Sequence, residues 1–193
     1  MRLSFPILLV LSSLAVGAQG PTTWRIRDVP PDLRARVSRA DLMIAALHDS
    51  VLRELADEIS SVGPAKAVDS CHIDSVLMTQ RIAREGARAG RTSDRLRNPT
   101  NAPPAWAAAI VSANAGRRAQ DVEGFAVDLG DRLGVLRPIA QRPICANCHG
   151  PKEKLSAGVR AALAERYPRD KAVGFQQGEI RGWFWVELAK HPK

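Results

Sequence analysis

The sequence lacks a long apolar run, a rich set of metal-binding side chains and an internal repeat. Its most apolar stretch, from about Phe5 to Val16, has roughly a dozen residues, short of the ~20 that a membrane-spanning helix needs. We therefore expect no stable membrane span. Only three of the 193 residues are cysteines and four are histidines. A closed zinc site needs four ligands, so zinc would have to recruit an unpaired cysteine from elsewhere in the chain.

Aromatic residues are also scarce, at 5% of the chain, while basic residues are in excess, with 28 Lys and Arg against 20 Asp and Glu. The basic residues are scattered and alternate with acidic ones, as in residues 81–97. A nucleic-acid-binding protein usually clusters them with stacking aromatics. We therefore expect no nucleic-acid partner, and we interpret the charge as a solvated basic surface that could meet an acidic protein.

The first 18 residues have the layout of a secretory signal peptide. Arg2 precedes the apolar stretch, and small residues follow it up to Ala18, where we place the cleavage. Removing Arg2 leaves an excess of seven basic residues over the 20 acidic ones. We expect an exported, periplasmic protein whose mature part, residues 19–193, forms a single domain.

Two long helices are predicted in the first half of the chain. Apolar residues recur in steps of three and four over residues 32–59, which places them on one stripe of an amphipathic helix. Pro31 marks its start, and Gly63 marks its end. A second helix is predicted from Pro64 to about Glu85. The stripe of the first helix could also pack against another copy of the protein and form a homodimer.

The second half is predicted to contain most of the sheet. Residues 86–106 carry three prolines and indicate turns and short extended pieces. Alternating apolar runs on both sides of a turn at Gly130 predict a β-hairpin over residues 123–140. Periodicity predicts a helix over 154–167, and aromatic and β-branched residues predict a closing strand over 178–188. Helices followed by a hairpin, a helix and a strand indicate an α+β domain around an antiparallel sheet.

The most informative cluster is Cys145-Ala-Asn-Cys148-His149. CxxCH is the attachment motif of a c-type haem, because the two thiols reach the two vinyl groups and the histidine is placed to bind the iron. A thioredoxin-like pair would not need His149, and a disulfide between the two cysteines is the plainest alternative in an exported protein. Export favours haem, which bacteria attach outside the cytoplasm. One such motif predicts one covalent haem.

Several segments together resemble the Tll0287-like, or DUF3365, family of haem-binding domains. They stand in the family's order and cover roughly residues 32–190. The segments are AKAVDSC (65–71), GRTSDRLRNPTNAPPAW (90–106), LRPI (136–139), CANCHG (145–150) and YPRDKAVGFQQGEIRG (167–182). The resemblance implies a PAS-like fold, an antiparallel sheet flanked by helices, that carries one c-type haem with a histidine and a cysteine as axial ligands.

The resemblance assigns roles to individual residues. Cys145 and Cys148 would form the thioethers, His149 would be the proximal iron ligand and Cys71 the distal one. His72 follows Cys71 directly and is turned about 100° away on a helix, so a small rotation or register shift could offer its imidazole instead.

Three arginines, Arg91, Arg97 and Arg181, are candidate contacts for the haem propionates, although arginines in polar loops are usually solvated. Trp106 and Tyr167 are predicted to pack in the core.

Two roles follow for such a haem. A thiolate favours ferric iron, so reduction could release Cys71 and open a site for a small ligand. This predicts a redox or small-ligand sensor that signals to a separate protein. The alternative is a periplasmic electron-transfer cytochrome. A peroxidase would need distal acid and base residues, and no arrangement in the sequence indicates them, so we expect no enzymatic activity.

Overall fold

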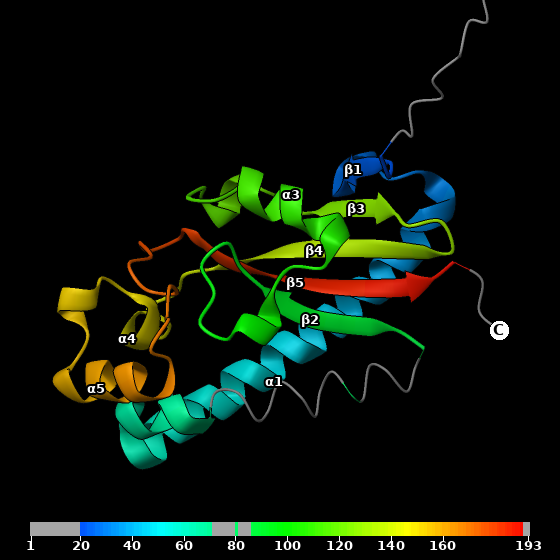
Figure 1. The fold of residues 1–193 in the computed structure, drawn as a ribbon. Coiled ribbons are helices and arrows are strands. Elements are labelled where there is room, and N and C mark those ends of the chain that lie inside the picture. The colour runs from blue at the N-terminus through cyan, green and yellow to red at the C-terminus, as the bar shows by residue number, and fades with distance from the viewer. Residues whose placement is uncertain (1–19, 71–79, 81–85, 191–193) are drawn as a thin grey trace, which may run out of the picture.

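The computed structural model describes residues 20–70, 80 and 86–190, and this part of the chain forms a five-stranded antiparallel sheet with helices around it (Figure 1). The strands are β1 (Thr23–Arg25), β2 (Arg88–Thr92), β3 (Phe125–Asp128), β4 (Arg132–Ala140) and β5 (Ile180–Ala189). Their order in the sheet is β1-β3-β4-β5-β2. The helices are α1 (Pro31–Ser70), α3 (Ala105–Ala113), α4 (Ala146–His149) and α5 (Ala157–Arg166). The predicted α+β class with an antiparallel, PAS-like sheet is therefore confirmed.

The predicted amphipathic helix is the first part of α1, which covers one face of the sheet (Figure 1). Its buried side chains include Leu33, Val37, Ala40, Ile44 and Leu47. Gly63 interrupts the helix with φ 80° and ψ 164°, a conformation that glycine adopts without strain. This confirms the predicted end of the first helix. Residues 64–70 are helical again, and most of the rest of the predicted second helix lies outside the described residues.

The hairpin predicted over residues 123–140 is formed by β3 and β4, and the predicted closing strand is β5. The structure adds β1, which the sequence did not indicate, and shows that one of the short extended pieces predicted over residues 86–106 is the strand β2. β1 pairs with β3 at one edge of the sheet, and β2 pairs with β5 at the other. Gly90 makes the second pairing possible, because a Cβ atom at this position would lie 2.7 Å from the ring of Trp185.

The two faces of the sheet bury different sets of side chains. The face toward α1 buries Leu133, Val135, Phe184 and Val186. The other face is covered by α3, where Trp106 packs with buried Leu136 and Trp183. The indole Nε1 of Trp106 donates a hydrogen bond to Oε1 of Glu187 at 2.9 Å. Trp106 is partly buried and packs against the core, in agreement with the predicted packing role.

A third, smaller cluster of buried side chains lies at one end of the sheet, where α4 and α5 meet the C-terminal part of α1 (Figure 1). Its members are Val68, Cys148, Leu155, Val159 and Leu163, with Tyr167 packed against them. Ser156 begins α5 by accepting a hydrogen bond from the backbone N–H of Val159. The predicted candidate site therefore lies at an end of the molecule, beside the large sheet core.

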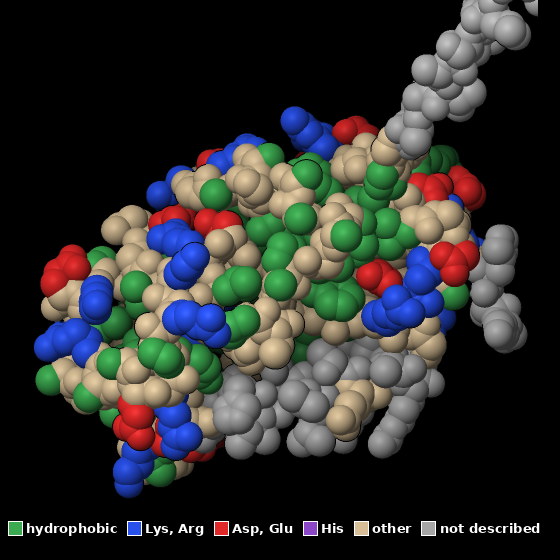
Figure 2. Space-filling model, in the orientation of Figure 1, with side chains coloured by type: hydrophobic (Ala, Val, Ile, Leu, Met, Phe, Trp, Pro, Cys, Tyr) green, Lys and Arg blue, Asp and Glu red, His purple; other side chains and the backbone are tan. Residues whose placement is uncertain are grey.

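The surface agrees with the scattered basic charge of the sequence. Figure 2 shows Lys and Arg side chains at several separate places on one face of the molecule, with Asp and Glu among them. Among the described residues, no helix is both long and apolar enough to cross a membrane.

Candidate cofactor site

The two cysteines and the histidine of the CxxCH motif share one helical turn. Cys145 lies at the N-terminus of α4, and its carbonyl accepts hydrogen bonds from the backbone N–H groups of Cys148 at 3.2 Å and His149 at 2.9 Å. Both cysteines are buried, and no disulfide joins them. The turn therefore holds two reduced thiols beside an imidazole. A cofactor that has two reactive groups and a metal would need this set of side chains.

His149 is held in one orientation by the backbone carbonyl of Ala172, which lies 2.7 Å from its Nδ1. A carbonyl oxygen can only accept a hydrogen bond, so Nδ1 carries the proton and Nε2 keeps its lone pair. The Phe175 ring and the imidazole pack in an edge-to-face arrangement, with ring centroids 6.3 Å apart. Metal-binding histidines usually have this arrangement, with one ring nitrogen on a carbonyl or carboxylate and the other on the metal.

The charge state of His149 suits the same role. Its pKa is lowered well below the usual 6.5, first by burial and then by the positive charges of Arg181 and Arg97. The hydrogen bond to Ala172 opposes this shift only in part. The imidazole is therefore neutral at pH 7, which is the form that binds a metal.

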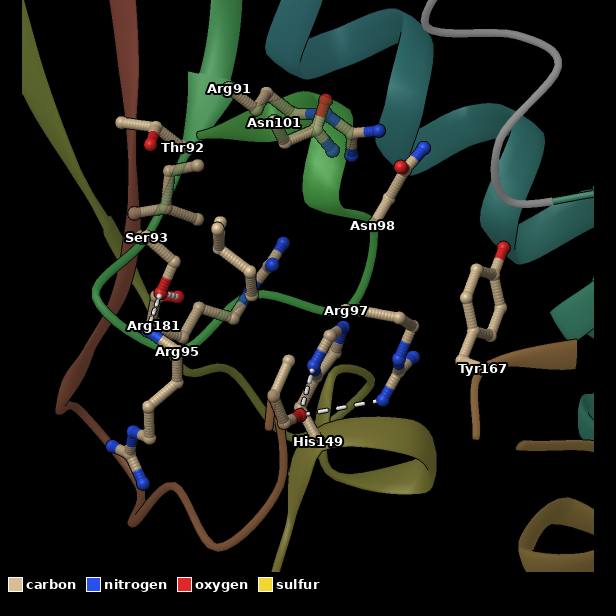
Figure 3. A pocket seen from close by; sticks show the side chains of 14 residues that line it. Arg91, Thr92, Ser93, Arg95, Arg97, Asn98, Asn101, His149, Tyr167 and Arg181 are labelled. Carbon is tan, nitrogen blue, oxygen red and sulfur yellow. Dashed lines mark hydrogen bonds between the residues drawn. The ribbon is translucent and has the colours of Figure 1, made fainter. Parts of the chain in front are cut away.

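A cavity opens beside His149 and is rich in arginine. Its lining includes His149, Ala172, Ile139, Thr92, Ser93, Asn98, Asn101, Tyr167 and the four arginines Arg91, Arg95, Arg97 and Arg181. Figure 3 shows His149 at one end of this cavity and Arg91, Asn98 and Asn101 at the other. The cavity combines a neutral imidazole with cationic groups, which suits a metal cofactor that carries acidic substituents.

Arg97 is bound to the turn that carries the motif. Its Nη2 donates to the carbonyl of Cys148 at 2.6 Å and to the carbonyl of Ala172 at 3.3 Å, while Nε pairs with Asp170 at 3.0 Å. Both side chains of the ion pair are largely buried, with exposed fractions of 11% and 9%. Arg97 therefore ties α4 to residues 170–172, and it shares the Ala172 carbonyl with the imidazole of His149.

Arg95 is similarly occupied, and it turns away from the cavity centre (Figure 3). Its guanidinium pairs with Glu179, donates to the carbonyl of Val173 and lies over the ring of Phe175. Through these contacts, Arg95 holds the segment that contains Val173 and Phe175, and this segment directly follows Ala172.

The structure brings together three of the five predicted site residues, Cys145, Cys148 and His149. The predicted distal ligand Cys71 and its alternative His72 lie outside the described residues. The three arginines suggested for propionate binding all line the cavity, although Arg97 is also held by protein groups.

Sequence reasoning missed the Ala172 carbonyl and the ion pair between Arg97 and Asp170, and no sequence motif indicates either of them. Within the described part of the chain, no three His, Cys, Asp or Glu side chains are grouped as metal ligands. A closed zinc site would therefore need residues outside this part.

Comparisons with known proteins give the same fold and a family. The model of the Tll0287-like family matches residues 32–189. The crystal structure of the cyanobacterial heme-protein Tll0287 is similar, with a TM-score of 0.57 and 20% sequence identity over 86% of this chain and 99% of that chain. No curated protein sequence matches. At this identity the structural match supports the fold, while the family model spans most of the sequence. The chain therefore belongs to the Tll0287-like family.

Proposed function

We propose that the protein is a c-type cytochrome that binds one haem covalently. In this proposal Cys145 and Cys148 form the two thioethers, and Nε2 of His149 binds the iron. The observation that carries the proposal is the neutral imidazole of His149, oriented by the Ala172 carbonyl and placed directly after two buried thiols. The solved relative that is called a heme-protein supports the same cofactor. A bound haem would supply a redox-active iron.

A histidine substitution tests the assigned iron ligand. Protein matured with a c-haem assembly system is purified as wild type, His149→Gly and His48→Gln. We expect His149→Gly to keep its covalent haem but lose the wild-type absorption spectrum, and added imidazole to restore it. His48 contacts Phe184 and is absent from the residues that line the cavity, so His48→Gln serves as the matched control. An unchanged spectrum in His149→Gly would overturn the assignment.

We further propose that the distal ligand is the thiolate of Cys71, with His72 as the alternative, and that the protein senses redox state or a small ligand. A thiolate donates charge to the iron and stabilises the ferric form. If haem is bound, a reduced iron would hold an anionic sulfur less firmly, so the Cys71 thiolate would take up a proton and be released as the neutral thiol. The segment that follows α1 would relay this change to a redox or signalling partner.

Carbon monoxide binding separates this role from simple electron transfer. Absorption spectra are recorded for ferric, ferrous and carbon monoxide-treated protein, as wild type and as Cys71→Ala. The sensor role predicts a ferric thiolate spectrum that Cys71→Ala abolishes, and uptake of carbon monoxide by the reduced wild type. If the substitution changes nothing and carbon monoxide does not bind, the distal ligand is another residue and the sensor role fails.

The excess of basic residues favours a second candidate, an electron-transfer cytochrome that meets an acidic redox protein. This role requires ligands that do not change with oxidation state. It also requires electron-transfer rates that fall steeply as salt is added, because salt screens the attraction between exposed charges.

Export to the periplasm is part of both candidates, and neither makes the protein an enzyme. N-terminal sequencing of the mature protein tests export, with cleavage expected after Ala18. Size-exclusion chromatography tests the proposed homodimer through the helix at residues 32–59.

A further inference from the structure

The backbone carbonyl of Ala172 accepts hydrogen bonds from two side chains, which its two lone pairs allow. His149 donates through Nδ1 at 2.7 Å, and Arg97 donates through Nη2 at 3.3 Å. The second hydrogen of the same Nη2 serves the carbonyl of Cys148, which lies 2.6 Å away. The guanidinium of Arg97 therefore binds both the hydrogen-bond partner of His149 and the turn that carries this histidine.

The carboxylate of Asp170 holds both Arg97 and Ala172. Its Oδ2 accepts a hydrogen bond from Nε of Arg97 at 3.0 Å, and its Oδ1 accepts one from the backbone N–H of Ala172 at 2.8 Å. Asp170 and Arg97 are both largely buried, so solvent does little to screen their charges. Asp170 therefore fixes the position of the guanidinium relative to Ala172 and offsets part of its positive charge.

The segment that contains Ala172 is also bound to the motif turn by backbone alone. The N–H of Gly174 donates to the carbonyl of Gly150 at 2.8 Å, and the N–H of Phe175 donates to the carbonyl of His149 at 3.0 Å. These two bonds involve no side chain. Substitution of the side chains of the ion pair therefore leaves them available to hold the Ala172 carbonyl near the imidazole.

The shared acceptor links Arg97 to the strength of His149 as a metal ligand. A hydrogen bond from the other ring nitrogen to a carbonyl raises the basicity of a metal-binding imidazole. A cation on the same carbonyl draws electron density from the oxygen, which makes the oxygen a weaker acceptor for the imidazole. A carboxylate that neutralises this cation reduces the effect. Arg97 and Asp170 therefore act on His149 in opposite directions.

We propose that Arg97 and Asp170 are positioning residues that set the reduction potential of the bound haem through the Ala172 carbonyl. The inference rests on the proposed haem function and adds a regulation of the same site. Arg97 limits the electron donation of His149 to the iron and so favours the ferrous form, whereas Asp170 moderates Arg97 and favours the ferric form. Hydrogen bonds around the ligands are one means by which a protein tunes a haem potential.

The test combines two measurements on haem-loaded protein. The midpoint potential is measured by spectroelectrochemical titration, and the Nδ1–H proton of His149 is followed by NMR in the ferric protein, where the iron shifts its signal away from the others. The variants are Arg97→Gln, Arg97→Lys and Asp170→Asn. The NMR signal reports on the hydrogen bond itself, which a general loss of stability would not shift in a set direction.

Arg95→Gln is the matched control for loss of a positive charge. Arg95 lines the same cavity as Arg97 and also pairs with a carboxylate, that of Glu179. It donates to the carbonyl of Val173, one residue beyond Ala172. The control therefore removes a guanidinium from the same cavity without removing a donor from the carbonyl that the imidazole uses.

We expect Arg97→Gln to lower the midpoint potential and Asp170→Asn to raise it. Each should change the ratio of ferrous to ferric protein at a fixed potential by about tenfold, which is about 59 mV for one electron. The Nδ1–H signal should move in opposite directions in these two variants. Arg97→Lys keeps the cation and should stay close to the wild type. Arg95→Gln should leave the Nδ1–H signal in place.

In wild-type protein that carries haem, two outcomes would overturn this inference alone. One is a potential that moves in the same direction in Arg97→Gln and Asp170→Asn, and the other is an Nδ1–H signal that Arg97→Gln leaves unchanged. Wild-type protein without covalent haem would overturn the proposed function together with the inference. If Arg97→Gln fails to load haem, Asp170→Asn decides: a raised potential supports the inference, and an unchanged or lowered one overturns it.

Discussion

The sheet core and the cavity end of the molecule are held together in different ways. The sheet buries apolar side chains on both faces, under α1 and α3. The packing of these faces depends on the sizes of the side chains. The cavity end has a small apolar cluster and relies on arginine side chains that bind backbone carbonyls and carboxylates. Burial of apolar area is nondirectional, whereas a hydrogen bond fixes a distance and an angle. The sheet therefore provides stability, and the cavity end provides the fixed orientation that His149 would need as the proposed iron ligand.

The largest effect is expected where the cavity end loses its central ion pair. Arg97→Leu leaves the buried carboxylate of Asp170 without its cation and releases the carbonyls of Cys148 and Ala172. Removing one partner of a buried pair costs about 3–5 kcal/mol. Urea unfolding should show a loss of this size. The double variant Arg97→Leu with Asp170→Leu should recover part of it, and a loss below about 1 kcal/mol in the single variant would contradict the account.

A similar but somewhat smaller loss is expected in the sheet core, without an effect on the site. Leu133 is fully buried on the α1 face of β4, near the end opposite Ile139 of the cavity wall. Leu133→Ala removes buried apolar atoms and leaves a space, which costs about 3 kcal/mol. The haem spectrum of the loaded variant should equal that of the wild type. A changed spectrum would show that the two regions are not independent.

Overpacking the edge strand tests the size-dependent fit of the sheet. A Cβ atom at Gly90 would lie 2.7 Å from the Trp185 ring, so Gly90→Ala must displace the indole. Extra atoms in a packed core cost about 1–3 kcal/mol. Thermal unfolding compares this variant with Gly20→Ala, where no other atom lies within 4 Å of the new Cβ. Equal melting temperatures for the two variants would mean that Gly90 is not constrained by packing.

The smallest effect is expected from pH, at the boundary between the two regions. The rings of His48 and Phe184 pack in an edge-to-face arrangement with centroids 5.5 Å apart, and the pKa of His48 is lowered from 6.5 by burial and by the charge of Arg142. The unfolded chain therefore binds a proton at a higher pH than the folded chain does. His48 therefore contributes stability above pH 6.5. This contribution is lost as the pH falls below 6.5, until the imidazole of the folded chain is also protonated.

Melting temperatures from pH 8 to pH 5 measure this effect. His48→Gln should show a smaller decrease than the wild type over the acidic half of this range. Identical decreases would contradict a contribution from His48.

The contrast between the two regions also explains how far the sequence could predict the fold. Apolar periodicity indicated the first helix, its end at Gly63, the hairpin and the closing strand, because each signal is local. β2 was not predicted as a regular strand, since RAGRT carries two small residues and three polar ones, and it pairs with β5 through its backbone and Trp185. The three-residue β1 is too short to carry a periodic signal.

The site shows the same division. The spacing of Cys145, Cys148 and His149 predicted a haem-attachment turn, and one helical turn does bring the three residues together. The Ala172 carbonyl that orients His149 is a backbone atom 23 residues away, and the partner of Arg97, Asp170, is 73 residues away. Contacts of this kind depend on the tertiary fold, so residue types alone could not show that Arg97 is the arginine that ties the site together.

The most direct test of a covalent haem on this turn is the intact mass of the denatured protein after maturation with a c-haem assembly system. The account predicts a wild-type mass equal to the polypeptide without residues 1–18 plus one haem. It predicts a mass without haem when Cys145 and Cys148 are both replaced by serine. A wild-type mass equal to that of the polypeptide alone, or a haem that the double variant keeps after denaturation, would contradict it.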